Sequence, residues 1–246
     1  MFNKIIRFAI VSIVLFSCKK QSVYNGRPIN IFVFNGLDNG YVIYGNYGDT
    51  LPVSFELSQR VTNGAAVSCN FEDPQIRARY FVSPDTLPKD NPVFDKQLTL
   101  QQGKSYSLYL VGDKSIAEDV LIENNFQRNN SDSITYVQVV NISNDQPVSV
   151  NIKDEPGGSL VPSLAYKEAT GFMALSADHT HPNYEFEFRD AATGELLFTE
   201  IVSEITGGPN SPNRFLYKNW TLVFKGKRSA TDINPISVRK TFYEIN

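Results

Sequence analysis

Alternation of apolar and polar residues is the feature that most constrains how this chain can fold. Val53, Phe55 and Leu57 alternate with polar residues, and Phe186 and Phe188 alternate with charged ones. The same alternation occurs at 105–110 and at 148–153. Successive side chains of a β-strand point to opposite faces, so each of these segments predicts a half-buried strand.

Turn-forming residues separate the alternating segments. Asn35-Gly36, Asn63-Gly64 and Pro156-Gly157-Gly158 are examples, and 206–213 adds further glycine and proline. Sustained apolar periodicity of the helical kind is absent, and 116–124 is the only stretch where we expect a helical turn. Short strands with such turns between them predict an all-β chain built from sandwiches of antiparallel sheets.

An internal repeat divides the chain into two halves. Residues 106–115 align without a gap on 220–229, and 31–35 resembles 137–141. Between the halves, residues 124–133 are polar and rich in asparagine, as expected of a linker. We therefore predict two tandem β-sandwich domains at 27–123 and 134–246, joined by a linker at 124–133.

The repeat also predicts a local backbone conformation. In each half the aromatic-led strand ends at a glycine, Gly112 in the first and Gly226 in the second, with a charged pair following. A glycine at the same place twice indicates a backbone need that other residues meet poorly, most simply a positive φ.

The N-terminal segment reads as a secretory signal. Lys4 and Arg7 precede an apolar stretch at 8–16, which is too short to span a bilayer. Leu15-Phe16-Ser17-Cys18 resembles the bacterial lipobox, in which the cysteine is acylated and becomes the mature N-terminus. We expect a signal peptide at 1–17, lipidation at Cys18 and a tether at 18–26. An uncleaved anchor and an ordinary secretory signal are the alternatives.

Charge and cysteine content exclude several classes of protein. The chain has 23 basic and 26 acidic side chains, a formal charge of −3. Removal of Lys4 and Arg7 leaves 23 − 2 = 21 basic residues, so the mature chain is near −5. A nucleic-acid partner is not expected, because nucleic-acid binding needs a basic face. Once Cys18 is acylated, Cys69 has no partner, and its small and apolar neighbours predict a buried thiol.

Three segments of the second half resemble a known family. They are 136–150, 163–175 and 186–197, and the first has an apolar strand ending in Asn141 before a turn and a second strand. They are similar to the domain of unknown function number 4397, found in surface lipoproteins of Bacteroidota. The resemblance implies immunoglobulin-like sandwiches and is faint over the first half, at 31–35 and 106–112. The pattern departs from the family at 178–183. The resemblance to this family implies no catalytic or binding residues.

Enzymatic and metal-binding motifs are not found in the sequence. His179 and His181 lie beside Asp178, but no further ligand is signalled nearby, so we predict no metal site. Glu185 and Glu187 share one outward strand face, which is typical of a solvated sheet surface. The nucleophile-elbow, zincin, phosphate-loop and dinucleotide motifs are all absent, and no cofactor is expected.

Tyr41, Tyr44 and Tyr47 are the sequence's candidates for ligand binding. Flat amphipathic rings stack on sugars or protein partners, although sandwiches also pack tyrosines into their cores. We expect a non-enzymatic lipoprotein, anchored in the outer membrane of the cell envelope through Cys18, that serves as a binding or structural module for a protein or glycan. The alternative is a carbohydrate-binding surface lipoprotein that uses exposed tyrosines.

Overall fold

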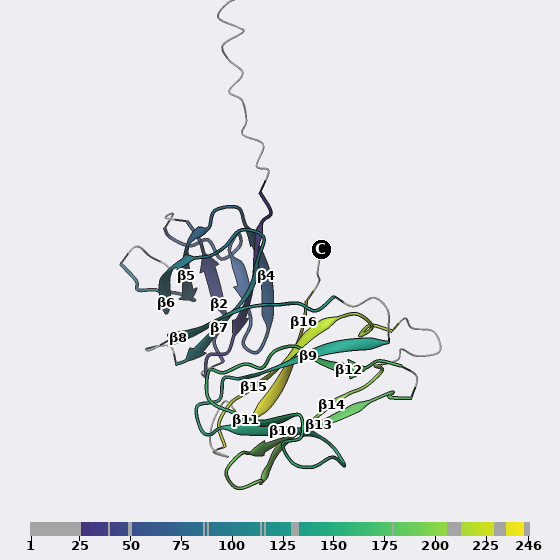
Figure 1. The fold of residues 1–246 in the computed structure, drawn as a ribbon. Helices are drawn as coiled ribbons and strands as arrows, with labels where there is room; N and C mark the ends of the chain where they lie inside the picture. Colours follow the sequence, from purple (N-terminus) through teal and green to yellow (C-terminus); the bar gives the residue numbers. More distant parts are fainter. Residues whose placement is uncertain are drawn as a thin grey trace, which may run out of the picture.

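The computed structural model describes residues 26–38, 40–48, 51–85, 87, 89–113, 115, 117–128, 133–178, 180–205, 213–228 and 235–243. The regular structure of this part of the chain consists of β-strands, arranged in four four-stranded sheets (Figure 1). A search of the same residues finds no helix long and apolar enough to cross a bilayer. The expected signal peptide and Cys18 lie outside the described residues.

The first half forms one β-sandwich, as predicted. The strand expected at Val53, Phe55 and Leu57 is wrong, because this segment runs through turns between two strands and Leu57 is 90% exposed. Its inner sheet has the order β4-β1-β7-β8 and its outer sheet the order β3-β2-β5-β6. The core between them includes the fully buried Ile31, Leu108 and Tyr80. The strands are β1 (Ile29–Asn35), β2 (Ile43–Asn46), β3 (Gln59–Val61), β4 (Ala66–Phe71), β5 (Gln75–Val82), β6 (Phe94–Thr99), β7 (Ser105–Gly112) and β8 (Ala117–Glu123).

The second half forms another β-sandwich. Its inner sheet has the order β12-β9-β15-β16 and its outer sheet the order β11-β10-β13-β14. Trp220, Phe186 and Phe188 are fully buried between them. The strands are β9 (Ile134–Asn141), β10 (Val148–Ile152), β11 (Val161–Leu164), β12 (Met173–Ser176), β13 (Tyr184–Asp190), β14 (Leu196–Val202), β15 (Asn219–Lys225) and β16 (Ser237–Tyr243).

The strand register agrees with the predicted internal repeat. β1 pairs with β7 in parallel, with Asn30 opposite Ser105, and β9 pairs with β15 in parallel, with Tyr136 opposite Asn219. All the other strand pairs are antiparallel among the described residues. The sheets are therefore mostly antiparallel, as expected, and each inner sheet adds one parallel pair that the alternation did not predict.

The same buried asparagine ends the first strand of each sandwich. Asn35 Nδ2 donates to the carbonyl oxygens of Tyr41 and Val61, and Asn141 Nδ2 donates to those of Gln146 and Leu164. Each side-chain oxygen accepts from the backbone N–H two residues later. Because both asparagines are completely buried, they satisfy backbone groups that water cannot reach.

The expected helical turn at 116–124 is wrong. Residues 117–123 form β8, which pairs with β7 along its whole length from Gly112 opposite Ala117 to Tyr106 opposite Glu123. The pairing satisfies one side of the β8 backbone, and Val120 packs into a buried cluster. Tertiary pairing thus overrides the weak local preference.

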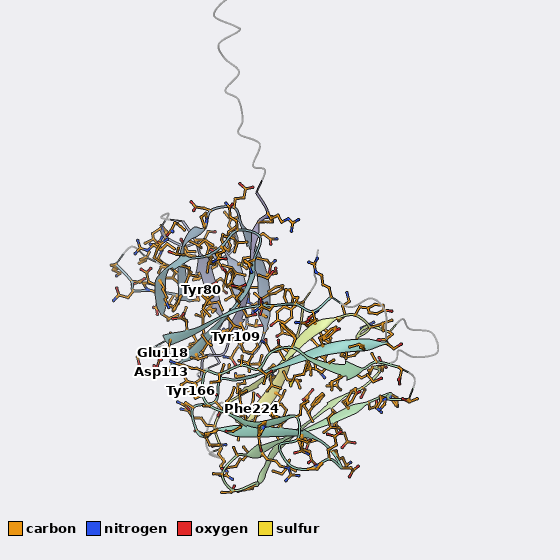
Figure 2. All side chains as sticks on the ribbon, in the orientation of Figure 1. Tyr80, Tyr109, Asp113, Glu118, Tyr166 and Phe224 are labelled. Carbon is orange, nitrogen blue, oxygen red and sulfur yellow. The ribbon has the colours of Figure 1, made fainter. Side chains whose placement is uncertain are left out.

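The two inner sheets pack against each other, so the protein has four sheet layers (Figure 1). A buried cluster joins Phe34, Tyr109 and Val111 of the first sandwich to Val140 and Val223 of the second. Figure 2 shows Tyr109 at the boundary between the two sandwiches. As a result, β1, β7, β9 and β15 are buried on both faces along nearly all their length.

Polar side chains inside this interface are paired with one another. Tyr243 Oη lies 3.1 Å from Ser107 Oγ and 2.8 Å from Thr221 Oγ1, and Thr221 also bonds Gln138. All four residues are buried. Their hydrogen bonds replace those to water, which lets polar residues lie between two sheets at little free-energy penalty.

The first part of the predicted linker is docked against both sandwiches. Asn124 is buried and hydrogen-bonds with Ser107. The Asn219 side chain accepts from the backbone N–H of Gln127 through Oδ1 and donates to its carbonyl oxygen through Nδ2. The Phe126 ring packs 5.0 Å from the Tyr243 ring. Within the predicted linker, Asn124 is thus buried and Phe126 partly buried, while Asn125 and Gln127 are exposed. Residues 129–132 lie outside the described residues.

Gly112 and Gly226 both have positive φ, at 87° and 98°, as the repeat predicted. We expect Gly112→Ala and Gly226→Ala each to lower the free energy of unfolding by about 1–2 kcal/mol, because an L-residue is strained there. Chemical denaturation of the purified variants measures this. Gly157→Ala is the control, since its Cβ would meet open space without a positive φ. Destabilisation of only one repeat would contradict the shared backbone role.

Lys225 is a buried cation at the interface between the two sandwiches, and its titration provides a test of that interface. Its Nζ donates to Asn63 Oδ1 of the first sandwich at 2.7 Å, with Arg239 and Asp38 as the neighbouring charges. Burial, followed by repulsion from Arg239, lowers the pKa of Lys225 to about 8, although Asp38 opposes the shift. The unfolded chain, with a lysine pKa of about 10.4, then binds more protons above pH 8.

We therefore expect the free energy of unfolding to gain a contribution from Lys225 that increases between pH 8 and pH 9.5. Lys225→Met should remove that contribution and leave a flatter profile over this interval. Denaturant titrations of both proteins at matched ionic strength measure the difference. Parallel pH profiles would show that the pKa of Lys225 is not lowered in the folded protein.

Candidate functional site

The three tyrosines suggested by the sequence do not form one binding face. Tyr41 is 36% exposed, whereas the Tyr44 ring packs 4.3 Å from that of Phe55. Tyr47 points into the first sandwich, where its ring packs 4.8 Å from that of Phe71. Tyr44 and Tyr47 are partly buried and only Tyr41 is exposed, so the three rings cannot stack together on a single sugar chain.

Tyr47 belongs to a buried polar group in the core. Its hydroxyl contacts the hydroxyl of Tyr80 and lies 3.2 Å from Cys69 Sγ, and the thiol donates to Gln59 Oε1 at 2.6 Å. Burial raises the pKa of Tyr47, Tyr80 and Cys69. The prediction of a buried, unreactive Cys69 is confirmed as to burial, because the residue is 7% exposed and is a free thiol.

Asp178 and His181 lie in an exposed loop and contact each other. His181 Nδ1 is 3.3 Å from Asp178 Oδ1, and Thr180 donates to the same carboxylate through its hydroxyl and its backbone N–H. These hydrogen bonds, that of the Thr180 hydroxyl first, hold the pKa of Asp178 below its usual range. His179 lies outside the described residues. Within the described ranges no three potential ligands gather as a metal site would require.

Glu185 and Glu187 form ion pairs with different basic side chains and are not arranged as an acid–base pair. Lys153 Nζ lies 2.8 Å from Glu185, and Arg189 lies 2.7 Å from Glu187. The hydrogen bond from Arg189, followed by that from Asn151, lowers the pKa of Glu187. This outer face of β13 is a solvated, ion-paired sheet surface, as the alternation predicted.

A cleft of about 650 Å³ lies where the first sandwich meets the docked linker. We call it the junction cleft. Its floor is the row of side chains that crosses the end of the first inner sheet, one from each of its strands or their ends. These residues are Asn70 of β4, Asn30 of β1, Ser105 of β7 and Asn124 directly after β8.

Strand pairing places the row in register. Asn30 is opposite both Asn70 and Ser105, and the N–H of Asn124 donates to the carbonyl of Ser105. Neighbouring strands are about 4.8 Å apart, so the row offers polar groups at regular spacing. The Asn30 amide Nδ2 donates to Ser68 Oγ and to Asn70 Oδ1. The second sandwich covers the apolar rows further along the sheet but not this one.

Charged and aromatic side chains form the walls of the junction cleft. Lys104 Nζ lies 2.7 Å from Glu123 Oε1, and that hydrogen bond and charge raise the pKa of Lys104. Arg27 and Arg128 add two further cations, and the partly buried Phe126 supplies a ring. The walls therefore combine three cations, one carboxylate and one aromatic face.

A second groove of about 530 Å³ continues from the junction cleft between the two sandwiches. It shares Asn30 and Asn70 with the cleft and extends along the edge strand β4. On its other side, Lys240 and Phe242 come from the edge strand β16, and Phe242 is 44% exposed. We call this second depression the edge groove.

The sequence contains only an indirect signal for this site. Asn30 and Asn70 lie in alternating segments whose polar faces predict ordinary solvated surface. Which polar positions become a cleft depends on how the second sandwich and the linker dock, and no local pattern encodes that.

Comparison with known proteins adds little to these observations. No family model and no curated protein matches the chain, so the resemblance to the domain of unknown function stays a prediction. Similar solved structures include a family 26 carbohydrate-binding module of Eubacterium rectale Amy13K in complex with maltoheptaose. It is 11% identical with a TM-score of 0.26, covering 89% of this chain and 97% of that one. The Bacillus anthracis TIE protein is 9% identical with a TM-score of 0.22, covering 88% and 44%. TM-scores this low do not support a conclusion about the fold or the function of this protein.

The buried thiol provides a test of the core. In a Cys18→Ser background, we expect Cys69 to react with iodoacetamide on the order of a hundredfold more slowly in the native protein than after denaturation, because burial disfavours the thiolate. Mass spectrometry of timed, quenched samples measures the rate. A native rate equal to that of the unfolded chain would mean that the thiol is accessible.

Proposed function

We propose that this protein is a non-enzymatic, lipid-anchored module of the bacterial cell envelope, and that it binds its ligand at the junction cleft. The observation that carries the proposal is the order of its parts. A charged segment and an apolar segment end at Cys18, and the first strand starts soon afterwards at Ile29. Acylation at Cys18 would tether the sandwiches to the outer membrane by a short segment.

The shape and chemistry of the junction cleft support a binding role. Its volume lies within the range of about 300–1,000 Å³ that is usual for ligand sites. It carries several polar side chains on a rigid floor made by four neighbouring strands. A floor of this kind loses little conformational freedom when a ligand binds.

The placement of perturbed groups supports a role other than catalysis. Tyr47, Tyr80, Cys69 and Tyr109 have pKa values raised by burial, and all four lie in packed interiors away from the cleft. In the cleft, the shifted group among the described residues is Lys104, whose pKa is raised by its ion pair. Such a pair keeps both groups charged and does not provide an acid or a base near neutral pH.

The docked sandwiches support the use of both together. The inner sheets share a buried apolar cluster and hydrogen bonds, so the walls of the cleft and groove come from parts held in one arrangement. We propose that immunoglobulin-like sandwiches of this kind present a fixed ligand surface at the membrane, with Phe126 of the linker completing it.

Anchoring is tested in a Gram-negative host by metabolic labelling with radioactive palmitate. We expect the protein to incorporate label and to partition into outer-membrane fractions, and Cys18→Ser to abolish both, because only the lipobox cysteine is acylated. Cys69→Ser is the matched control and should keep the label. Label that persists in Cys18→Ser would reject the anchor.

A further inference from the structure

We infer that the junction cleft, together with the edge groove, binds an oligosaccharide. This rests on the proposed function as a binding module and names the class of its ligand. The one observation behind it is a row of amide and hydroxyl side chains across the floor of the cleft, beside an aromatic ring.

The chemistry of the floor matches that of sugars. Each hydroxyl of a saccharide both donates and accepts hydrogen bonds, and an asparagine side chain offers two donors and an acceptor. Asn70 is exposed, and in the described part of the chain its Nδ2 makes no hydrogen bond. Ser105 is partly exposed, and its hydroxyl makes no hydrogen bond with the described residues, so it too can bind a ligand.

Asn30 adds a buried acceptor that has no donor. Its Nδ2 makes two hydrogen bonds, but its Oδ1 makes none in the described part of the chain. A buried polar atom without a partner is destabilising by roughly 1–3 kcal/mol. The polar row therefore contains an amide whose hydrogen-bonding capacity the described residues do not fill.

The second sandwich is an internal control for the floor. At the positions equivalent to Asn70 and Asn30 it has Ala174 and Tyr136. At the position equivalent to Ser105 it has Asn219, whose side chain holds the linker. The same fold therefore forms without a free amide row, so the polar floor of the first sandwich is not a requirement of its packing.

The walls fit a sugar better than a fully apolar ligand. The Phe126 ring lines the cleft and is partly exposed, so its uncovered part can contact the C–H groups of a saccharide. Arg128 and the Lys104–Glu123 pair present further donors and acceptors for hydroxyl groups. Such charged walls would be desolvated unfavourably by an apolar molecule.

The combined volume of the two depressions offers room for several sugar units. The cleft of about 650 Å³ and the groove of about 530 Å³ share Asn30 and Asn70, so they adjoin at the polar row. Phe242, which is 44% exposed, lines the edge groove and provides a second aromatic ring. An aromatic ring in each depression suits a chain of sugars.

The experiment uses the full chain in mild detergent on an array of neutral and acidic oligosaccharides. The strongest glycan is then titrated by calorimetry, with an expected Kd of about 1 mM or tighter. Asn70→Ala and Ser105→Ala should each lower the affinity about tenfold, the effect of losing a hydrogen bond or two. Asn183→Ala, which changes an exposed asparagine outside the cleft, is the matched control and should bind as the wild type.

Thermal unfolding of each variant checks that the fold is kept. Binding that resists both floor substitutions would place the glycan elsewhere and overturn the inference. Failure of every glycan would also overturn it. A peptide library run in parallel distinguishes the proposal that the cleft binds a ligand from the inference that this ligand is an oligosaccharide. Peptide binding lost in Asn70→Ala would leave the cleft as a binding site but reject sugar as its ligand, whereas no ligand of either class would reject binding at the cleft as well.

Discussion

The two inner sheets pack on each other through residues that are apolar on the sides facing away from each sandwich's own core. Phe34, Tyr109 and Val223 would be exposed on the outer faces of separate sandwiches, and together they form a buried cluster. Burial of apolar surface drives such an association, and the Tyr243 hydroxyl network removes the penalty for the polar residues among them. Docking of the linker and formation of the cleft both follow from this contact.

The duplicated buried asparagine shows how each sandwich fixes the end of its first strand. Asn35 and Asn141 each bond two carbonyl oxygens and one N–H that would otherwise be buried without partners. An apolar residue of similar size would leave those groups unsatisfied. The two halves thus keep a common framework while their surfaces differ, as the floor of the cleft differs from its counterpart.

The candidate site lies where the duplication is broken. The amide row occurs in the first sandwich, and the matching row of the second contains Tyr136 and Tyr243, of which Tyr243 seals the interface. The first sandwich therefore has a polar surface at this row, while the second contributes a ring to the contact between the two. Such a division lets one fold supply both a rigid joint and a place for a ligand.

The sequence predicted the all-β class, the strands at 105–110, 148–153 and 184–188, the repeat and the positive φ of Gly112 and Gly226. Those features depend on side-chain alternation and local backbone needs, which are encoded residue by residue. Contacts between distant segments were needed to show that Ser107 and Thr221 are buried, that Tyr47 points inward, that 117–123 is a strand and that 53–57 is not. It also decided that Asn30 and Asn70 line a cleft. The physical reason is that a period of two separates the two faces of a strand, but what covers the second face depends on residues far away in the chain.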